Sequence, residues 1–300
     1  MNAAPVSRSQ LEFYAQPSAM TSAGRHAALF KELPVDLAEL VSVIQQLVIY
    51  DVVAPEFYGF SIPEQRQGEI HLRSTARILD RILALDDRPL SAPRPAQHRI
   101  AGRCHHFVVL LVAMLRARQI PARARCGFGA YFNPPAFEDH WVCEYWNEAE
   151  TRWVLVDAQF DETWQRKLSI RHDVLDVPRD QFLVAADAWT KCRTRKIDPA
   201  KFGISFVKLH GLWYVAGNLV RDVAALNKTE PLPWDVWGAQ PRENERLSAD
   251  QHAYFSRLAA LTTGPDVSFD ELGRAFHADP GLAVPAQVYN ALLQRQEPFE

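Results

Sequence analysis

Three residues of this chain, Cys104, His140 and Asp157, are of the types that nucleophilic catalysis uses. A cysteine attacks an acyl carbon as its thiolate. An imidazole can take the thiol proton and later return it to a leaving amine. A carboxylate on the second ring nitrogen fixes the tautomer and stabilises the imidazolium. Each residue alone also has an ordinary structural explanation, so the elements that place the three decide their meaning.

Cys104 begins a stretch with the period of an α-helix. Apolar residues follow it at helical spacing, namely Val108, Leu111, Val112 and Leu115. Cys104 lies four residues before the first of them and therefore extends the same face. At this position the helix dipole favours the thiolate, and backbone N–H groups can hold a developing oxyanion. Gln97 and His98, just upstream, are candidate side-chain donors to that oxyanion.

The other two residues lie at the ends of two predicted strands. Residues 139–146 and 152–157 are rich in aromatic and β-branched residues, and the polar residues 147–150 form a turn between them. A four-residue loop over 147–150 pairs Trp146 with Thr151 and His140 with Asp157, and directly opposed side chains are about 5 Å apart at Cβ. The pairing depends on the turn, because a slip of one residue would break it.

The remaining sequence supplies elements around this core. We expect a loosely ordered arm over residues 1–26, a helix over 34–52 capped by Asp36, and a second helix over 63–85 that is interrupted or begins around Gly68. Further along we expect an extended linker over 86–99, a bent strand over 122–132, a helix near 180–191, a dense apolar segment over 201–237, and two or three helices over 248–300. This predicts an N-terminal helical region (1–97), a core (98–240) and a C-terminal helical appendage (241–300).

Composition excludes several classes of protein. The 300 residues carry a net charge of −3, and acidic and basic residues are mixed along the chain, so we expect neither nucleic acid nor a membrane surface as a partner. The four cysteines form no CxxC pair, and the N-terminus lacks the apolar run of a signal peptide. We therefore expect a cytoplasmic protein with reduced thiols.

A metal site is the alternative use of the same residue types. Cys104, His105, His106, His140 and Cys143 are all ligand types. None of them forms a pair at finger spacing, and adjacent histidines on a helix diverge by about 100°. We therefore expect no metal and no other cofactor.

The other cysteines, tryptophans and arginines near the core have structural interpretations. Cys126, Cys143 and Cys192 are expected to be buried and inert. The tryptophans at 141, 146 and 153 are expected to pack in the core rather than around a substrate. Arg123 and Arg125 share one strand face, which is either solvated or binds a substrate carboxylate.

The segments around Cys104, His140 and Asp157 together resemble the transglutaminase-like superfamily, whose core is papain-like. The sequence on either side of them is of the type found in bacterial members of that superfamily. The similar sequence segments are Gly102-Arg103-Cys104, Met114–Arg123, Asp139–Tyr145 and Arg152–Asp157. The Gly-Arg-Cys and Asp-His motifs among them also resemble the peptide N-glycanase branch. The resemblance covers about residues 98–162. It implies an α+β fold with the cysteine helix packed on an antiparallel sheet.

By resemblance, Cys104 is the nucleophile, His140 the general base and acid, and Asp157 the orienting carboxylate. His105, His106 and Trp141 are candidates to line the site, together with Gln97. The chain departs from the family where Asp157-Ala158-Gln159 replaces the usual Asp-Pro, and where Trp141 directly follows His140. No acidic loop suggests the calcium sites of animal transglutaminases.

These observations predict a cysteine-dependent enzyme that acts on an amide or related acyl group through a thioester. Water as the acceptor gives an amidase or protease, and an amine gives acyl transfer; the residues do not distinguish the two. A small molecule or peptide is the expected substrate. A catalytically silent binding module with the same fold is the alternative. The substrate, the acceptor and the oligomeric state have no signature in the sequence.

Overall fold

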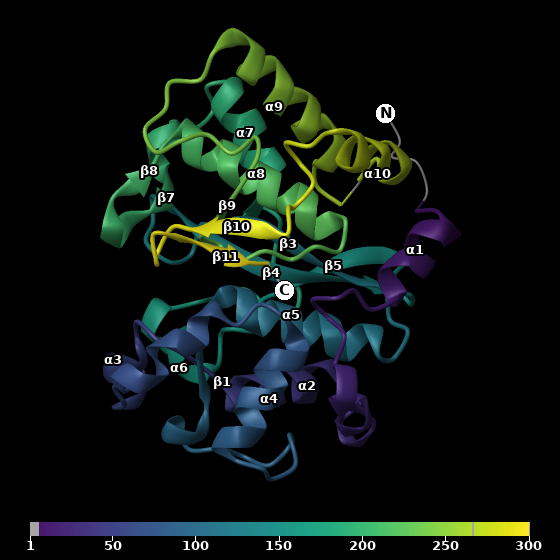
Figure 1. Ribbon diagram of the computed structural model, residues 1–300, viewed down its shortest axis with the longest axis vertical. Coiled ribbons are helices and arrows are strands. Elements are labelled where there is room, and N and C mark those ends of the chain that lie inside the picture. The colour runs from purple at the N-terminus through teal and green to yellow at the C-terminus, as the bar shows by residue number, and fades with distance from the viewer. Residues whose placement is uncertain (1–5, 266, 300) are drawn as a thin grey trace. The chain divides into compact units, whose positions relative to one another are not determined.

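The computed structural model describes residues 6–265 and 267–299, and the chain divides into two compact units. We call residues 12–123 and 142–177 the Cys104 unit, and residues 1–11, 124–141 and 178–300 the His140 unit. Helix α1 (Arg8–Ala15) and strands β3 (Ala122–Gly129) and β4 (Phe137–Asn147) each run from one unit into the other. Helices and sheets are mixed along the chain, which confirms the α+β class (Figure 1). The contiguous three-part division remains a prediction.

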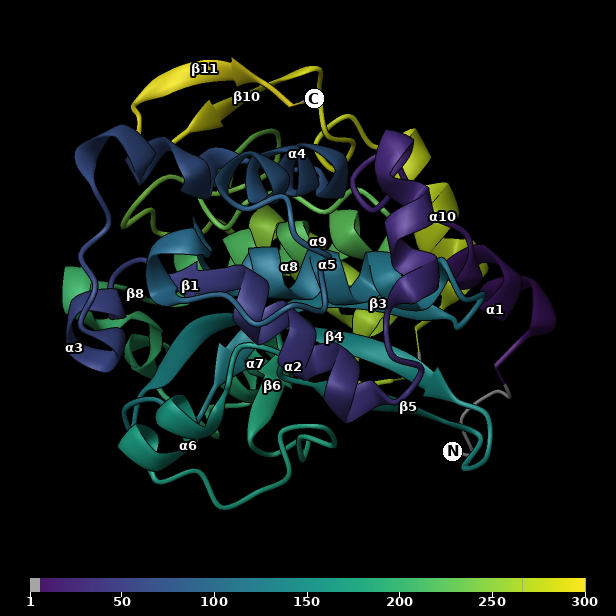
Figure 2. The same ribbon diagram turned by 90° about the horizontal axis from the view of Figure 1, so that it is seen from below.

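Helix α5 (Cys104–Arg116) is the central element of the Cys104 unit. All 13 of its residues are buried, and α2 (Leu37–Leu47) and α4 (Thr75–Leu85) pack against it (Figure 2). The unit also contains η1 (Gly24–Glu32), α3 (Ala54–Tyr58), η2 (Glu64–His71), η3 (Ala96–His98), β5 (Arg152–Val156) and α6 (Glu162–Leu168). The predicted cysteine-bearing helix is thus confirmed.

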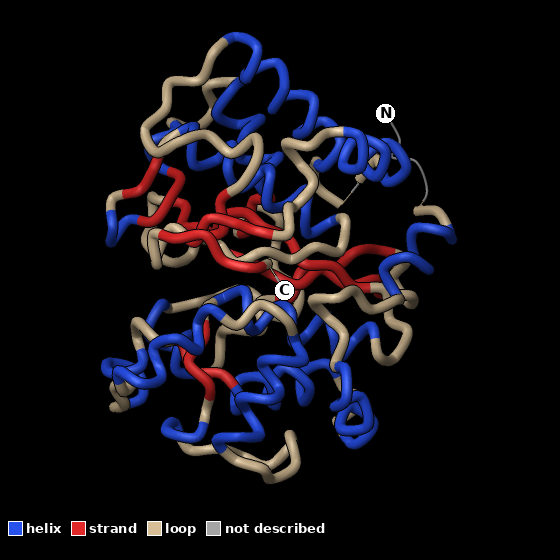
Figure 3. Tube along the Cα trace, viewed as in Figure 1, coloured by secondary structure: helices blue, strands red, loops and turns tan. Residues whose placement is uncertain are grey.

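Two short parallel strands lead to the start of α5. Strand β1 (Val48–Tyr50) pairs with β2 (Ile100–Gly102), and both are short (Figure 3). Tyr50 lies opposite Gly102. The helix predicted over 34–52 is correct as far as Leu47, and its Asp36 cap accepts the Glu39 N–H at 3.0 Å. Its last residues form β1 instead, because a β-branched and aromatic triplet fits a buried strand. Since parallel strands end at the same edge, the residues after β1 and β2 are neighbours.

Several other expected elements differ in the structure. The first 26 residues contain α1 and the start of η1 rather than a loose arm, although residues 1–5 lie outside the described part. The helix over 63–85 is interrupted, as expected, but the break lies at residues 72–74, between η2 and α4, rather than at Gly68. The linker 86–99 contains η3. Residues 182–184 form strand β6 before helix α7 (Ala185–Arg193). Residues 287–298 form a hairpin rather than a helix, because Gln287–Asn290 alternates exposed and buried residues.

The β4–β5 hairpin forms as predicted, but its register is shifted by two residues. Asn147 pairs with Arg152, and Cys143 pairs with Val156. The turn begins one residue later than expected, because the Asn147 side chain accepts the backbone N–H groups of Ala149 and Glu150 at 3.1 and 3.3 Å. The predicted opposition of His140 and Asp157 is therefore wrong. A shift of two preserves the face of every side chain.

The His140 unit is built on a sheet with the order β6-β3-β4-β7-β8, where β7 spans Phe202–Ile204 and β8 spans Leu209–His210. Helix α8 (Leu212–Leu226) packs against α7, α9 (Ala249–Thr262) and α10 (Phe269–Ala278) (Figure 1). A second sheet contains β9 (Asp235–Val236), β10 (Gln287–Asn290) and β11 (Arg295–Pro298). Two short 3₁₀ turns, η4 (Pro199–Lys201) and η5 (Ser205–Val207), complete the unit.

The predicted bend of β3 corresponds to a close approach between strands. A Cβ on Gly127 would collide with the backbone carbonyl oxygen of Leu183 in β6. Glycine is required at this position because a side chain would not fit.

Among the described residues, no helix is both long and apolar enough to cross a membrane.

Arg123 and Arg125 are completely buried, which contradicts both expected roles. The Arg123 Nε lies 2.6 Å from the Glu144 carboxylate, and its guanidinium lies 4.0 Å from the Trp153 ring. Arg125 forms a bidentate pair with Asp222 of α8, at 3.0 and 2.9 Å. An alternating strand pattern shows which residues share a face but not what covers that face, so both pairs were missed.

Candidate active site

Cys104 is the first residue of α5, and its side chain is 5% exposed. The preceding residue, Arg103, is extended, so the chain enters the helix directly from strand β2. The thiol therefore belongs to the first turn of a 13-residue helix, at the positive end of the helix dipole.

A fixed positive charge stands next to Cys104. Arg103 Nε and Nη2 donate to the two carboxylate oxygens of Asp51 at 2.9 and 3.0 Å, across the ends of β1 and β2. Burial acts to lower the pKa of Arg103, but the hydrogen bonds to Asp51 outweigh it and raise the pKa. Arg103 thus remains charged. Asp51 is not predicted from the sequence, because residues 34–52, which include strand β1 and Asp51, have the period of a helix.

His105 and His106 are both completely buried in α5. His106 Nδ1 accepts the backbone N–H of Arg103 at 3.0 Å, so the neutral imidazole carries its proton on Nε2. Burial lowers the pKa of His106 to about 4. His106 is therefore a neutral residue that supports the start of α5, and it is unsuited to proton transfer near pH 7.

His106 predicts a pH dependence of folding stability. Its pKa rises from about 4 when folded to its ordinary 6.5 when unfolded, so the unfolded chain binds the extra proton. The contribution of His106 to the free energy of unfolding is fully present above pH 6.5. It is lost as the pH falls toward 4, and the loss is about 3 kcal/mol. Urea titrations between pH 4 and 7.5 should show a shallower slope for His106→Gln than for the wild type. Identical slopes would contradict a buried neutral His106.

Asp157 follows β5 and leaves the hairpin ladder. Its backbone N–H donates to the Val174 carbonyl at 2.8 Å, and its Oδ1 accepts the backbone N–H of Gln159 at 3.2 Å. The residue is 1% exposed. The backbone of this turn thus holds the carboxylate of Asp157.

The segment after Asp157 is joined to the segment after β1. Asp161 caps α6 through Thr163 and Trp164, and its Oδ2 accepts the Tyr58 hydroxyl at 2.7 Å. Burial and this hydrogen bond raise the pKa of Tyr58. The ring of Trp164 meets that of Tyr50 edge to face, with centroids 5.6 Å apart. The loops that follow β1, β2 and β5 are therefore connected within the Cys104 unit.

His140 lies in β4, in the His140 unit, and its side chain is 1% exposed. Aromatic rings surround its imidazole edge to face, with centroid distances of 4.8 Å to Phe132 and 6.2 Å to both Tyr131 and Phe182. Such rings fix the plane of the imidazole without adding charge. The structure thus packs the His140 ring among aromatic side chains.

Asp139, beside His140 in the chain, belongs to a polar network on α8. Asn218 Nδ2 donates to Asp139 Oδ1 at 2.5 Å, and Arg221 Nη1 donates to Asn218 Oδ1 at 3.0 Å. Burial raises the pKa of Asp139, although Arg221, Asn218 and Tyr214 act to lower it. This network anchors β4 on α8 immediately before the candidate base.

Cys104 and Asp157 belong to one unit and His140 to the other. That the three act together is therefore a proposal. Gln97 is exposed in η3, where its carbonyl accepts Arg66 Nη1 at 2.7 Å, and His98 contacts Asp86 at 3.1 Å. Trp141 and Trp153 are buried, at 1% and 3% exposure, as expected of core residues, whereas Trp146 is half-buried.

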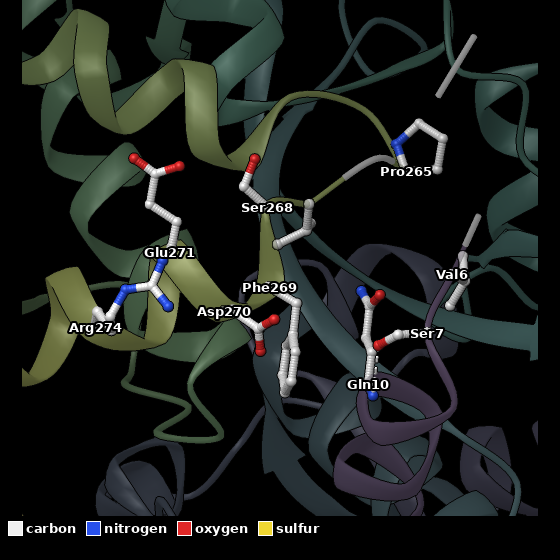
Figure 4. A pocket seen from close by; sticks show the side chains of 10 residues that line it. Val6, Ser7, Gln10, Pro265, Ser268, Phe269, Asp270, Glu271 and Arg274 are labelled. Atoms are coloured by element: carbon white, nitrogen blue, oxygen red, sulfur yellow. Dashed lines mark hydrogen bonds between the residues drawn. The ribbon is translucent and has the colours of Figure 1, made fainter. Parts of the chain in front are cut away.

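A pocket of about 310 Å³ lies at the start of α10 in the His140 unit (Figure 4). Ser7 and Gln10 of the N-terminal segment line it, with Ser268, Glu271 and Arg274 on the other side. None of the candidate residues is among those that line it. Among the described residues, no group of three or more His, Cys, Asp or Glu side chains could hold a metal ion.

Comparison with known proteins agrees with the expected class. Residues 79–158 match the model of the transglutaminase-like superfamily. No curated protein matches the sequence. A crystal structure described as a putative cysteine protease from Cytophaga hutchinsonii is similar at 21% identity and a TM-score of 0.33, over 61% of this chain and 50% of that one. The chain thus spans half the length of that protein.

Proposed function

We propose that this protein is a cysteine-dependent enzyme that attacks an amide or a related acyl carbon and forms a thioester. The observation that carries the proposal is the position of Cys104, the first residue of a buried helix, beside the Arg103–Asp51 pair and within the segment that matches the transglutaminase-like superfamily. Backbone N–H groups there are suited to holding an oxyanion.

In the proposed mechanism, His140 removes the thiol proton and Cys104 attacks the acyl carbon. His140 then gives the proton to the leaving amine, and Asp157 stabilises the imidazolium. Water or an amine attacks the thioester and releases Cys104. Hydrolysis and transfer use the same residues and differ in whether water is excluded. The support for Asp157 is its fixed turn, and the support for His140 is its packing among aromatic side chains.

The cysteines themselves provide an internal control for the test. All four are thiols outside any disulfide and at most 7% exposed, so exposure does not separate them. Burial raises the pKa of Cys143, and it raises the pKa of Cys192 to about 12. Differences in reactivity should therefore report the chemical environment of each thiol.

We expect iodoacetamide to label Cys104 at least about tenfold faster than Cys126, Cys143 or Cys192 at pH 6.5, where a free thiol of pKa about 8.5 is mostly protonated. His140→Ala should slow Cys104 by a further tenfold or more, since general bases contribute about 10²-fold. Peptide mass spectrometry against time and pH measures each rate.

The alternative, a catalytically silent binding module, makes the opposite prediction. Cys104 would then label no faster than the other cysteines, and His140→Ala would change nothing. That pair of results would refute the proposal for the free protein.

A further inference from the structure

His140 lies in a part of β4 between two ladders. On the edge of β4 away from β3, the pairs with β7 end at Glu138 and the pairs with β5 begin at Cys143. Residues 139–142, which include His140, lie between these two points. Ladder hydrogen bonds hold a strand in place, so this segment depends more than the rest of β4 on contacts from other elements.

Asn218 of α8 supplies such a contact. The residue is 1% exposed, and its Nδ2 donates to Asp139 Oδ1 at 2.5 Å and to the Gly127 carbonyl of β3 at 3.5 Å. Its Oδ1 accepts Arg221 Nη1 at 3.0 Å. The two amide hydrogens and the carbonyl oxygen of Asn218 are thus all used. One buried carboxamide therefore joins β3, β4 and α8.

Both strands that Asn218 holds lead to the His140 imidazole. In β4, the residue that accepts its N–H directly precedes His140. In β3 it holds Gly127, and the segment that follows β3 carries Tyr131 and Phe132, whose rings meet the imidazole edge to face. All of these residues belong to the His140 unit. The bridge thus acts on the imidazole and on two of the rings that pack against it.

We propose that Asn218 is a positioning residue, which sets the place of the His140 imidazole through Asp139 and Gly127. The inference rests on the proposed function, in which His140 is the base, and it adds a residue of α8 that takes no part in proton transfer itself. A base must lie within hydrogen-bond distance of the proton that it removes, and a misplacement of about 1 Å can lower a rate by up to about 10²-fold. The bridge controls position rather than charge, so a variant that keeps its hydrogen bonds should keep its effect.

The rate of Cys104 alkylation by iodoacetamide at pH 6.5 tests the inference. We expect Asn218→Ala to slow it about tenfold, and Asp139→Ala to do the same, because each variant removes one side of the bridge. Asp139→Asn should stay within about twofold of the wild type, since its carboxamide oxygen can still accept the Asn218 N–H. The matched control is Asn227→Ala at the end of α8, where Nδ2 donates to the Val223 carbonyl at 2.8 Å. It should keep the wild-type rate.

A double variant separates positioning of His140 from an independent structural effect. If Asn218 acts through His140, Asn218→Ala should cause no further slowing in a His140→Ala background, because residues that act together are not additive. An equal slowing in both backgrounds would overturn the inference. So would a wild-type rate in Asn218→Ala when His140→Ala is slow.

An NMR measurement reads the position of His140 whether or not Cys104 is reactive. Ring currents of the neighbouring aromatic side chains shift the Cε1–H resonance of His140, which is identified by its loss in His140→Ala. Asn218→Ala should move this resonance toward that of a free histidine, and Asn227→Ala should leave it in place. An unmoved resonance in Asn218→Ala would contradict the inference. If Asn218→Ala does not fold, Asp139→Ala provides the same comparison.

The two measurements also distinguish the inference from the proposed function. Equal alkylation rates in the wild type and His140→Ala would reject His140 as the base, and with it the proposed function. The resonance of His140 in Asn218→Ala would then decide by itself whether Asn218 positions the imidazole.

Discussion

Replacing Cys104 with alanine should abolish acylation of the protein by an activated ester such as p-nitrophenyl acetate. In the wild type we expect an acyl adduct on Cys104 that hydroxylamine removes, as a thioester requires. Removal of a catalytic nucleophile lowers rates by about 10³-fold or more. The measurement is the initial burst of p-nitrophenolate, with mass spectrometry of the acylated peptide.

The control is Cys143→Ala, which removes a thiol equally buried in β4. It should leave the burst unchanged. Both variants lose a small buried side chain, so similar small changes in Tm would show that folding is not the cause. A full burst from Cys104→Ala would mean that another residue is acylated, and the assignment of the nucleophile would be wrong.

Helical periodicity predicted the part of the site around Cys104. The apolar spacing after Cys104 indicates a buried helix wherever it is found, and α5 begins at that residue. The neighbouring strand β1 was not predicted, because a strand of three residues is too short to show an alternating pattern. Its pairing with β2, some 50 residues away, decides that Val48–Tyr50 is a strand. The Arg103–Asp51 pair could therefore not be predicted.

The hairpin shows the limit of predicting register. The number of loop residues was right, yet the turn begins after Asn147 because the Asn147 side chain binds the turn backbone, and Thr151 takes a left-handed conformation with φ 50°. Such local bonds are not visible in a pattern of strand residues. Continuing the observed ladder by one pair would place Asp157 opposite Val142 rather than His140.

Gln159 was visible in the sequence only as a departure from Asp-Pro. Its carboxamide is buried and has no hydrogen-bond partner among the described residues, and this depends on the surrounding fold and not on the residue type. The burial of Arg123 and Arg125 also depends on the fold, because their buried carboxylate partners lie 21 and 97 residues away. Motifs thus locate residues that react, while the residues that position them or bind substrate need the fold.

Glu69→Gln should produce the largest loss of stability, because Glu69 carries a buried network. Its carboxylate accepts Arg66 Nε and Nη2 at 2.8 and 2.9 Å, Arg81 Nε at 2.7 Å, and the backbone N–H of Ala101 at 2.7 Å. Breaking a buried ion pair from one side costs about 3–5 kcal/mol. Because Ala101 lies three residues before Cys104, we also expect slower alkylation of Cys104. Glu64→Gln, exposed in the same 3₁₀ helix, is the control.

The pH dependence of this network separates it from His106. Burial acts to raise the pKa of Glu69, but the hydrogen bonds from Arg66, Ala101 and Arg81 outweigh it and lower the pKa below 4.5. The network therefore stabilises the fold above pH 4.5 and is lost as the pH falls through the lowered pKa, whereas His106 acts between pH 6.5 and about 4. Urea titrations of Glu69→Gln should show a deficit that is constant from pH 5 to 8 and shrinks below pH 4. A deficit that grows on acidification would show that the carboxylate is not the charged centre of the network.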